Sequence, residues 1–68
     1  MPVVVDKEKV LKLNLSFNQI DNLEFLKEFK NLKKLNLCSN VIKGVLALKD
    51  LVDLECLDIS FNRIDNIN

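Results

Sequence analysis

Two cysteines carry the most reactive side chains of this 68-residue chain, which contains no histidine. Cys38 and Cys56 offer thiols for a disulfide, for a soft metal ion or for redox chemistry. They lack the Cys-x-x-Cys spacing of metal and redox motifs, however, and histidine is the commonest general base near neutral pH. The single glycine, Gly44, excludes a glycine-rich phosphate loop. We therefore predict a protein that is not an enzyme and that holds no metal and no cofactor.

Aliphatic residues that recur every 22 positions indicate which elements position these thiols. The pattern is aliphatic-x-x-Leu-x-aliphatic-x-x-Asn-x-Ile, and it occurs three times in succession. The matching residues are Val10, Leu13, Leu15, Asn18 and Ile20, then Leu32, Leu35, Leu37, Asn40 and Ile42, then Leu54, Leu57, Ile59, Asn62 and Ile64. A constant period of this length predicts stacked units that each contact only their neighbours.

Each period combines two kinds of spacing. Leu35 and Leu37 are two positions apart, which is the strand period, so both are expected to point inward from a short extended segment. Aliphatic residues at every third position from Ile42 to Leu54 fit a tight or 3₁₀-like helical return, or one edge of an α-turn. Each repeat is therefore predicted to be a strand, a turn and a helical return, and stacked repeats would bury one continuous leucine core.

The asparagines of the pattern have a structural interpretation. Asn18, Asn40 and Asn62 follow each predicted strand, where the chain turns and its peptide groups lose their partners in the sheet. A carboxamide offers both a donor and an acceptor. We predict that these side chains form a ladder that satisfies the turns of neighbouring repeats.

This pattern resembles the leucine-rich-repeat family, specifically the 22-residue class found in a regulatory subunit of protein phosphatase 1 and in bacterial internalins. The resemblance covers the chain from Val10 to Asn68. It implies an α/β fold, a right-handed solenoid of about three coils with a short parallel β-sheet on the concave face and 3₁₀ or α-helical returns on the convex face. The repeats would span residues 10–31, 32–53 and, incompletely, 54–68, after an irregular N-terminal arm or partial cap at 1–9. The resemblance also implies a protein partner that docks on the concave sheet.

Residues that alternate with the inward leucines are the candidates for contacting this partner. They are Lys12, Asn14 and Ser16 in the first strand, Lys34, Asn36 and Cys38 in the second, and Cys56, Asp58 and Ser60 in the third. Phe17 and Phe61 are expected to pack at the corners between strand and turn rather than to serve as exposed anchors. For Phe25, an exposed contact and burial against the N-terminal arm both stay open.

The predicted register also determines the state of the two thiols. Cys38 ends the outward column of the second strand and Cys56 begins that of the third, so they would lie roughly 14 Å apart. A disulfide requires Cα atoms within about 7 Å. We therefore expect free thiols in a reducing compartment, while a disulfide between two chains stays open. With no secretory signal and no apolar run long enough to span a membrane, we expect a cytoplasmic location, with the nucleus as the alternative.

Net charge and the end of the repeat pattern limit the partners. Ten basic and ten acidic residues give a formal net charge of zero, which argues against strong binding to nucleic acid or to an anionic membrane. The third repeat has no helical return and is expected to leave an open apolar end. The residues of this open end are Leu57, Ile59, Ile64 and Ile67. The primary hypothesis is a protein-interaction module. The alternative is a structural protein that forms homodimers or stacks through its ends. Two further possibilities, a fragment of a longer solenoid and a marginally stable monomer, also stay open. A more remote hypothesis is a regulator or inhibitor of an enzyme.

Overall fold

The structure is a computed structural model that describes residues 6–64. Three short strands, β1 (Lys12–Asn14), β2 (Lys34–Asn36) and β3 (Cys56–Asp58), form one parallel sheet in the order β1-β2-β3. The register aligns Leu13 with Leu35 and Leu35 with Leu57. The parallel sheet that the family resemblance implies is thus confirmed. The alignment of positions 22 residues apart, which the repeat pattern predicts, is confirmed as well.

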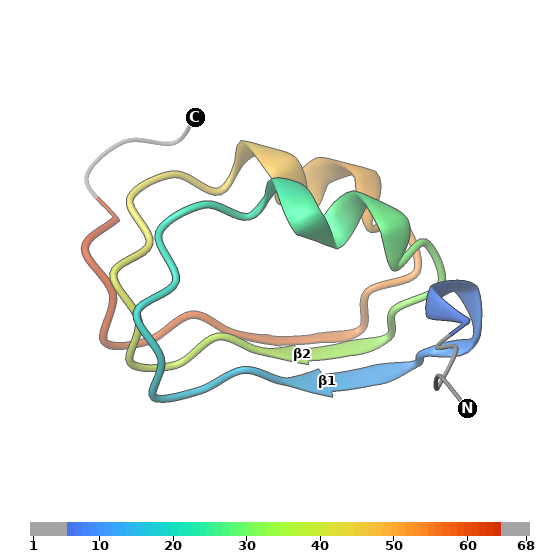
Figure 1. Cartoon of the computed structure of the whole chain (residues 1–68), viewed down its shortest axis with the longest axis horizontal. Coiled ribbons are helices and arrows are strands. Elements are labelled where there is room, and N and C mark those ends of the chain that lie inside the picture. Colours follow the sequence, from blue (N-terminus) through green and yellow to red (C-terminus); the bar gives the residue numbers. More distant parts are fainter. Residues whose placement is uncertain (1–5, 65–68) are drawn as a thin grey trace, which may run out of the picture.

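Helical returns lie on the opposite side of the molecule from the sheet (Figure 1). Both η2 (Glu24–Glu28) and η3 (Leu46–Asp50) are 3₁₀ helices, which is one of the two kinds of return that the three-residue spacing allows. In η2, the amide of Leu26 donates to the carbonyl oxygen of Leu23 at 3.0 Å, and that of Phe29 donates to Leu26 at 3.0 Å. Because side chains three positions apart eclipse in a 3₁₀ helix, these apolar residues share the side that faces the sheet. The number of coils and their handedness stay predictions.

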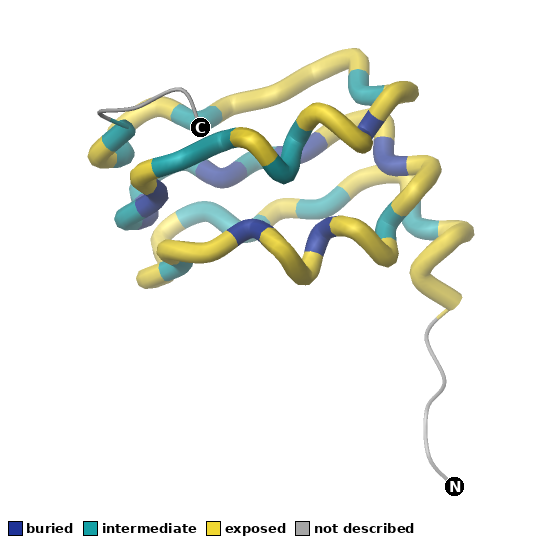
Figure 2. Tube along the Cα trace, turned by 90° about the horizontal axis from the view of Figure 1, so that it is seen from above, coloured by how far each residue is buried: buried dark blue, intermediate teal, exposed yellow. Residues whose placement is uncertain are grey.

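The core lies between the sheet and the returns. Its buried residues come from both layers and from the connections between them: Leu23, Leu26, Leu32, Leu35, Leu37, Ile42 and Leu51. In Figure 2, buried positions alternate with more exposed ones along the first helical return and through the middle turn of the chain, as expected when each segment contributes only its inward side chains. Residues 54–64 contain no buried position. One buried polar residue, Asn40, belongs to this interior. No helix in the part of the chain that the structure describes is long and apolar enough to cross a membrane.

A third 3₁₀ helix, η1 (Lys7–Lys9), lies within the segment predicted as an N-terminal arm or partial cap. The side chain of Asp6 accepts a hydrogen bond from the amide of Glu8 and caps this helix. Lys7 places its ammonium 2.6 Å from Glu28 of η2 and 6.0 Å from the centre of the Phe29 ring. Lys7 lies 22 positions before Phe29, so it has the equivalent place in the preceding period, and its side chain contacts the first return. The rest of the predicted arm, residues 1–5, lies outside the described residues.

Candidate functional site

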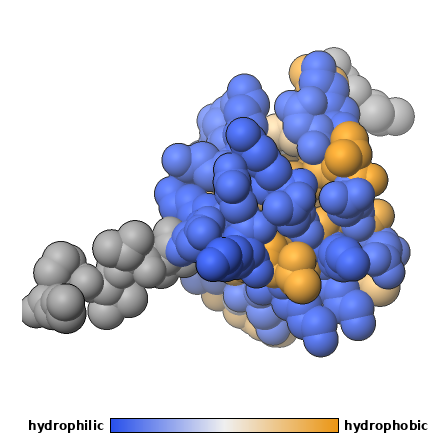
Figure 3. Space-filling view, turned by 90° about the vertical axis from the view of Figure 1, so that its right-hand side faces the viewer, coloured by the Kyte–Doolittle hydropathy of each residue, from blue (hydrophilic) through white to orange (hydrophobic). Residues whose placement is uncertain are grey.

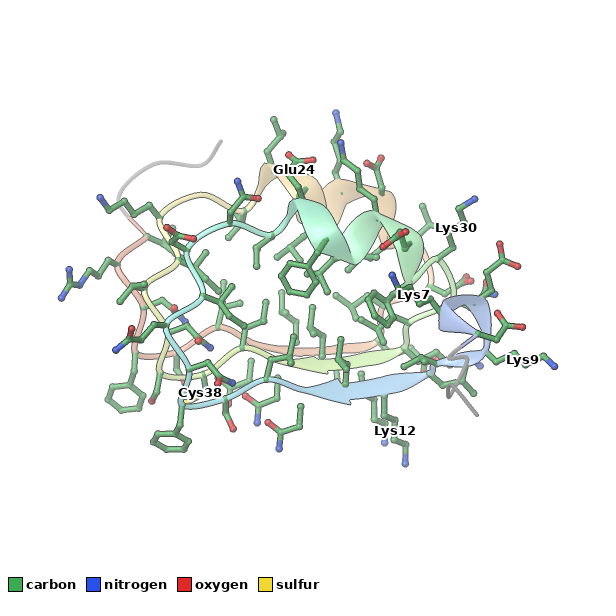
Figure 4. The ribbon with its side chains drawn as sticks, viewed as in Figure 1. Lys7, Lys9, Lys12, Glu24, Lys30 and Cys38 are labelled. Carbon is green, nitrogen blue, oxygen red and sulfur yellow. The ribbon has the colours of Figure 1, made fainter. Side chains whose placement is uncertain are left out.

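The nine alternating strand residues lie on one surface, which we call the outer sheet face. It comprises Lys12, Asn14, Ser16, Lys34, Asn36, Cys38, Cys56, Asp58 and Ser60, and none of them is buried. Figure 4 shows Lys12 projecting from the sheet on the side opposite the helical returns. Strand pairing places Lys12, Lys34 and Cys56 in one row, and Asn14, Asn36 and Asp58 in a second row. The structure therefore brings the predicted contact residues together.

A shallow hollow of about 450 Å³ extends across the three strands. All three residues of β1, β2 and β3 line it, so leucine as well as lysine, asparagine, cysteine and aspartate residues contribute to its lining. Backbone and side-chain groups from three neighbouring strands are thereby available to the same bound segment. A hollow that is open along the sheet suits an extended chain better than an enclosed small molecule.

The middle row of this face has a structural role that the sequence interpretation missed. Asn14 Oδ1 accepts hydrogen bonds from the amide of Ser16 at 3.0 Å and from its hydroxyl at 2.7 Å. Asn36 and Asp58 accept the corresponding amides two residues later, at 2.9 Å each. Each side chain thus satisfies an N–H group where its strand ends. The available signal was an Asn or Asp two positions before a small polar residue, repeated three times.

Asp58 is the acidic residue of the middle row. The Ser60 hydroxyl and then the Ser60 amide donate hydrogen bonds to its carboxylate, and both lower the pKa of Asp58 below its ordinary value. Hydrogen bonds to the charged form favour it. Asp58 therefore contributes a negative charge to the outer sheet face across the neutral pH range.

The lysines of the first row are available for a partner. Among the residues that the structure describes, neither Lys12 nor Lys34 makes an ion pair. The two side chains occupy paired positions on adjacent strands, so their Cα atoms are about 5 Å apart. Two neighbouring, unpaired ammonium groups form a local positive site on a chain whose net charge is zero.

The cysteines lie as the predicted register places them. Cys56 pairs with Lys34, four residues before Cys38 along β2, and both thiols are free. The Cys38 sulfur is 3.4 Å from the hydroxyls of both Ser39 and Ser60. Within residues 6–64, no group of three histidine, cysteine or acidic side chains is arranged to hold a metal ion. The Cys38 thiol thus takes part in a hydrogen-bonding group with Ser39 and Ser60.

The asparagines of the repeat pattern connect neighbouring turns. Asn40 Oδ1 accepts from the amide of Ile20 at 3.1 Å, and its Nδ2 donates to the carbonyl oxygens of Leu15 at 3.0 Å and Leu37 at 2.9 Å. Asn62 makes the equivalent bonds to the turn of Asn40, including one at 3.1 Å from the amide of Ile42. Asn18 donates only within its own turn. These bonds hold the ends of the three strands in register.

The expectation that Phe17 and Phe61 pack at the corners is wrong. Their exposed fractions are 80% and 81%, and both residues have positive φ, 58° and 55°. Ser39, at the equivalent position of the second turn, has a φ of 60°. The left-handed backbone turns these side chains away from the core, which the aliphatic pattern does not encode. Phe25, for which two outcomes were open, is 39% exposed on η2.

The residues predicted for an open apolar end differ in exposure. Leu57 is 41% exposed, whereas Ile59 and Ile64 are half-buried and pack against the core. Ile67 lies outside the described residues. Self-association through these side chains stays a prediction.

The side of the molecule that carries η1 has a different character. Figure 3 shows it largely covered by hydrophilic residues, with small hydrophobic patches between them. Lys7 and Lys9 project on this side (Figure 4). On the neighbouring η2, Lys27 pairs with Glu24 at 2.6 Å, which raises the pKa of Lys27. Exposed ion pairs of this kind support solubility and contribute little to stability.

Comparison with known families identifies the repeat. A family model described as Leucine Rich repeat matches residues 7–23 and residues 52–67, which include β1 and β3 with the turns that follow them. The chain belongs to the leucine-rich-repeat family. No curated protein and no solved structure matched it. Residues of the middle repeat lie between the matched segments and share their strand register and asparagine hydrogen bonds.

Leucine-rich repeats generally serve as non-catalytic modules for binding proteins, and their parallel sheets provide extended surfaces for this purpose. In this leucine-rich-repeat chain, the parallel sheet consists of β1, β2 and β3, and its exposed side is the outer sheet face. The specific likeness of the chain to the class found in the phosphatase regulator and the internalins stays a prediction.

Proposed function

We propose that this leucine-rich-repeat chain is a non-catalytic interaction module that binds a protein partner through the outer sheet face. The observation that carries this proposal is the hollow of about 450 Å³ lined by all three strands. It offers two unpaired lysines and a row of hydrogen-bonding side chains on one rigid sheet. A rigid scaffold that presents polar groups in fixed rows reduces the entropic cost of binding.

The charge of the chain favours a protein over other macromolecules. With a net charge of zero and only two lysines on this surface, the site lacks the excess of cations that binding to nucleic acid requires. The same two lysines suit a single carboxylate, because a charged pair formed in a partly dehydrated hollow is stronger than one in open solvent. The proposed partner therefore presents acidic and hydrogen-bonding groups.

Photo-crosslinking in the source cell tests the proposal at defined positions. A photoreactive amino acid replaces Cys56 on the outer sheet face in one variant and Lys49 on η3 in the control. We expect a covalent adduct with a distinct protein from position 56 and none from position 49. The captured protein is then purified, and its affinity is measured for a Lys12→Ser and Lys34→Ser double variant, which should bind about tenfold more weakly.

Two results contradict the proposal. Equal adducts from both positions, or none from position 56, would show that the outer sheet face has no special role. An adduct between two copies of the chain would instead support self-association, which light scattering over a concentration series measures independently.

A further inference from the structure

Two phenylalanine rings stand exposed at one end of the outer sheet face. Phe17 and Phe61 occupy the same position in their turns as Ser39 does in the middle turn. Backbone hydrogen bonds continue the sheet through this row: the Phe17 amide donates to Cys38, and the Ser39 amide donates to Ser60, at 3.0 Å each. Figure 4 shows Cys38, the neighbour of Ser39, away from Lys12 along this side of the molecule. The two phenylalanines therefore flank Ser39 in one row.

The backbone of this row holds the rings away from the core. A positive φ is unusual for a residue as bulky as phenylalanine, and glycine or asparagine adopts it at lower cost. The exposed rings recover little of this cost by burial, since about four-fifths of each side chain is accessible. Two large apolar side chains in a costly conformation do not improve folding of the chain. Exposed aromatic side chains on a strained backbone indicate a surface that binds a partner.

The spacing of the row suits the insertion of one side chain. Neighbouring strands are about 4.8 Å apart, so Phe17 and Phe61, which are two strands apart, lie roughly 10 Å from each other. This spacing refers to the Cα atoms, and the residue between them in the row, Ser39, has a small side chain. Apolar atoms pack at about 4 Å, and an aliphatic or aromatic side chain between the rings therefore contacts both.

Lysines at the other end of the face determine the chemistry of the partner. Lys12 precedes Phe17 by five residues, which corresponds to roughly 15 Å along the sheet. The lysine row lacks ion pairs among the described residues. An extended segment of about five residues spans this distance and crosses the hollow between the two ends.

We infer that Phe17 and Phe61 form an aromatic clamp for an aliphatic or aromatic side chain of the partner, while Lys12 and Lys34 bind a carboxylate about five residues away in the same extended segment. The inference rests on the proposed function and adds the chemistry of the partner. Aromatic residues provide most of the affinity at many protein interfaces, whereas charged pairs at the rim govern orientation and association rate.

A library of random peptides displayed on phage is the probe, selected on the immobilised full chain. We expect enriched peptides to combine an acidic residue with an aliphatic or aromatic residue about five positions away. Their affinity is then measured for a Phe17→Ser and Phe61→Ser double variant, for a Lys12→Ser and Lys34→Ser double variant, and for a Val52→Ser control. Val52 is as exposed as the two phenylalanines, at 82%, but lies after η3.

The expected result is a loss of about tenfold or more in affinity for each double variant and none for the control. Serine already occupies this backbone conformation at Ser39, so the phenylalanine variant should keep its thermal midpoint. Peptides that lose affinity with the lysine variant alone would overturn the clamp and leave the proposed function standing. A selection without enriched peptides, or with peptides that ignore both double variants, would overturn both. If the chain itself dimerises and the phenylalanine variant is monomeric, a second copy occupies the clamp and the inferred partner is wrong.

Discussion

Asn40 lies where two turns meet, and its carboxamide replaces the sheet partners that the backbone loses there. It is 6% exposed and bonds both to its own turn and to the preceding one. Asn18 has the same position in the repeat pattern but is exposed and bonds only within its own turn. The two side chains should therefore contribute differently to the free energy of unfolding, because an unpaired polar group is costly only where water cannot reach it.

Replacing Asn40 with alanine should lower the free energy of unfolding by about 2–3 kcal/mol, since the Ile20 amide and the Leu15 and Leu37 carbonyl groups lose their partner. Asn18→Ala is the matched control and should cost about 1 kcal/mol or less, because its two acceptors lie near solvent. Urea unfolding followed by circular dichroism measures both values. Equal losses would contradict the role assigned to the buried asparagine.

Asp58 gives the fold a dependence on pH. The Ser60 hydroxyl and amide hold the pKa of Asp58 below its ordinary value, so protonation weakens the folded state. Because the pKa in the folded state is the lower one, this stabilisation is complete above the unfolded pKa, about 3.9, and is lost as the pH falls through the folded pKa. The contribution should therefore disappear in the acid range below about pH 4.

Removing the hydroxyl in Ser60→Ala should raise the pKa of Asp58, because this bond is the largest cause of its shift. NMR titration of the Asp58 carboxyl group measures the change. The control is Ser16→Ala, which removes the corresponding hydroxyl bond to Asn14, a side chain that does not titrate. An unchanged Asp58 titration in Ser60→Ala would refute the proposed cause of the shift.

At the scale of elements, the turns after β1, β2 and β3 share one backbone conformation although their residues differ. Phe17, Ser39 and Phe61 all have φ between 55° and 60°. The turn geometry is thus set by the sheet hydrogen bonds on one side and by the asparagine bonds on the other. The side chain at the position with positive φ is therefore free to vary, and two of the three turns have a phenylalanine at this position.

Phe17→Asn should raise the free energy of unfolding by about 0.5–1 kcal/mol, because asparagine adopts a positive φ more readily and little packing is lost. The control is Val52→Asn, which makes a similar change at an exposed position outside the row of positive φ. Thermal unfolding measures both variants. A clear loss of stability in Phe17→Asn would mean that the ring supports the fold and is not held out for a partner.

These elements also show what the sequence could predict. The strands, their register and the helical returns follow from aliphatic spacing, because only one alignment places Leu13, Leu35 and Leu57 on the same side of the sheet. Two features do not follow from it. The direction of Phe17 depends on a backbone angle that hydrophobic spacing leaves open, and the capping by Asn14 depends on a rotamer that turns its side chain along the strand end.

At the scale of the whole molecule, the account depends on one arrangement. Equivalent positions of the three repeats lie side by side in a parallel sheet, so residues 22 positions apart become neighbours on one surface. This register places Lys12 beside Lys34, and it brings these lysines, the aromatic clamp and the hollow onto the same surface. An antiparallel or helical arrangement would distribute the same side chains over different faces.

Nuclear Overhauser spectroscopy of the chain in solution tests this arrangement most directly. The account predicts backbone cross-peaks between Leu13 and Leu35 and between Leu35 and Leu57, in the pattern of parallel strands. Strong cross-peaks between opposing Hα atoms, which mark antiparallel pairs, would contradict it, as would continuous helical contacts through residues 12–14, 34–36 and 56–58.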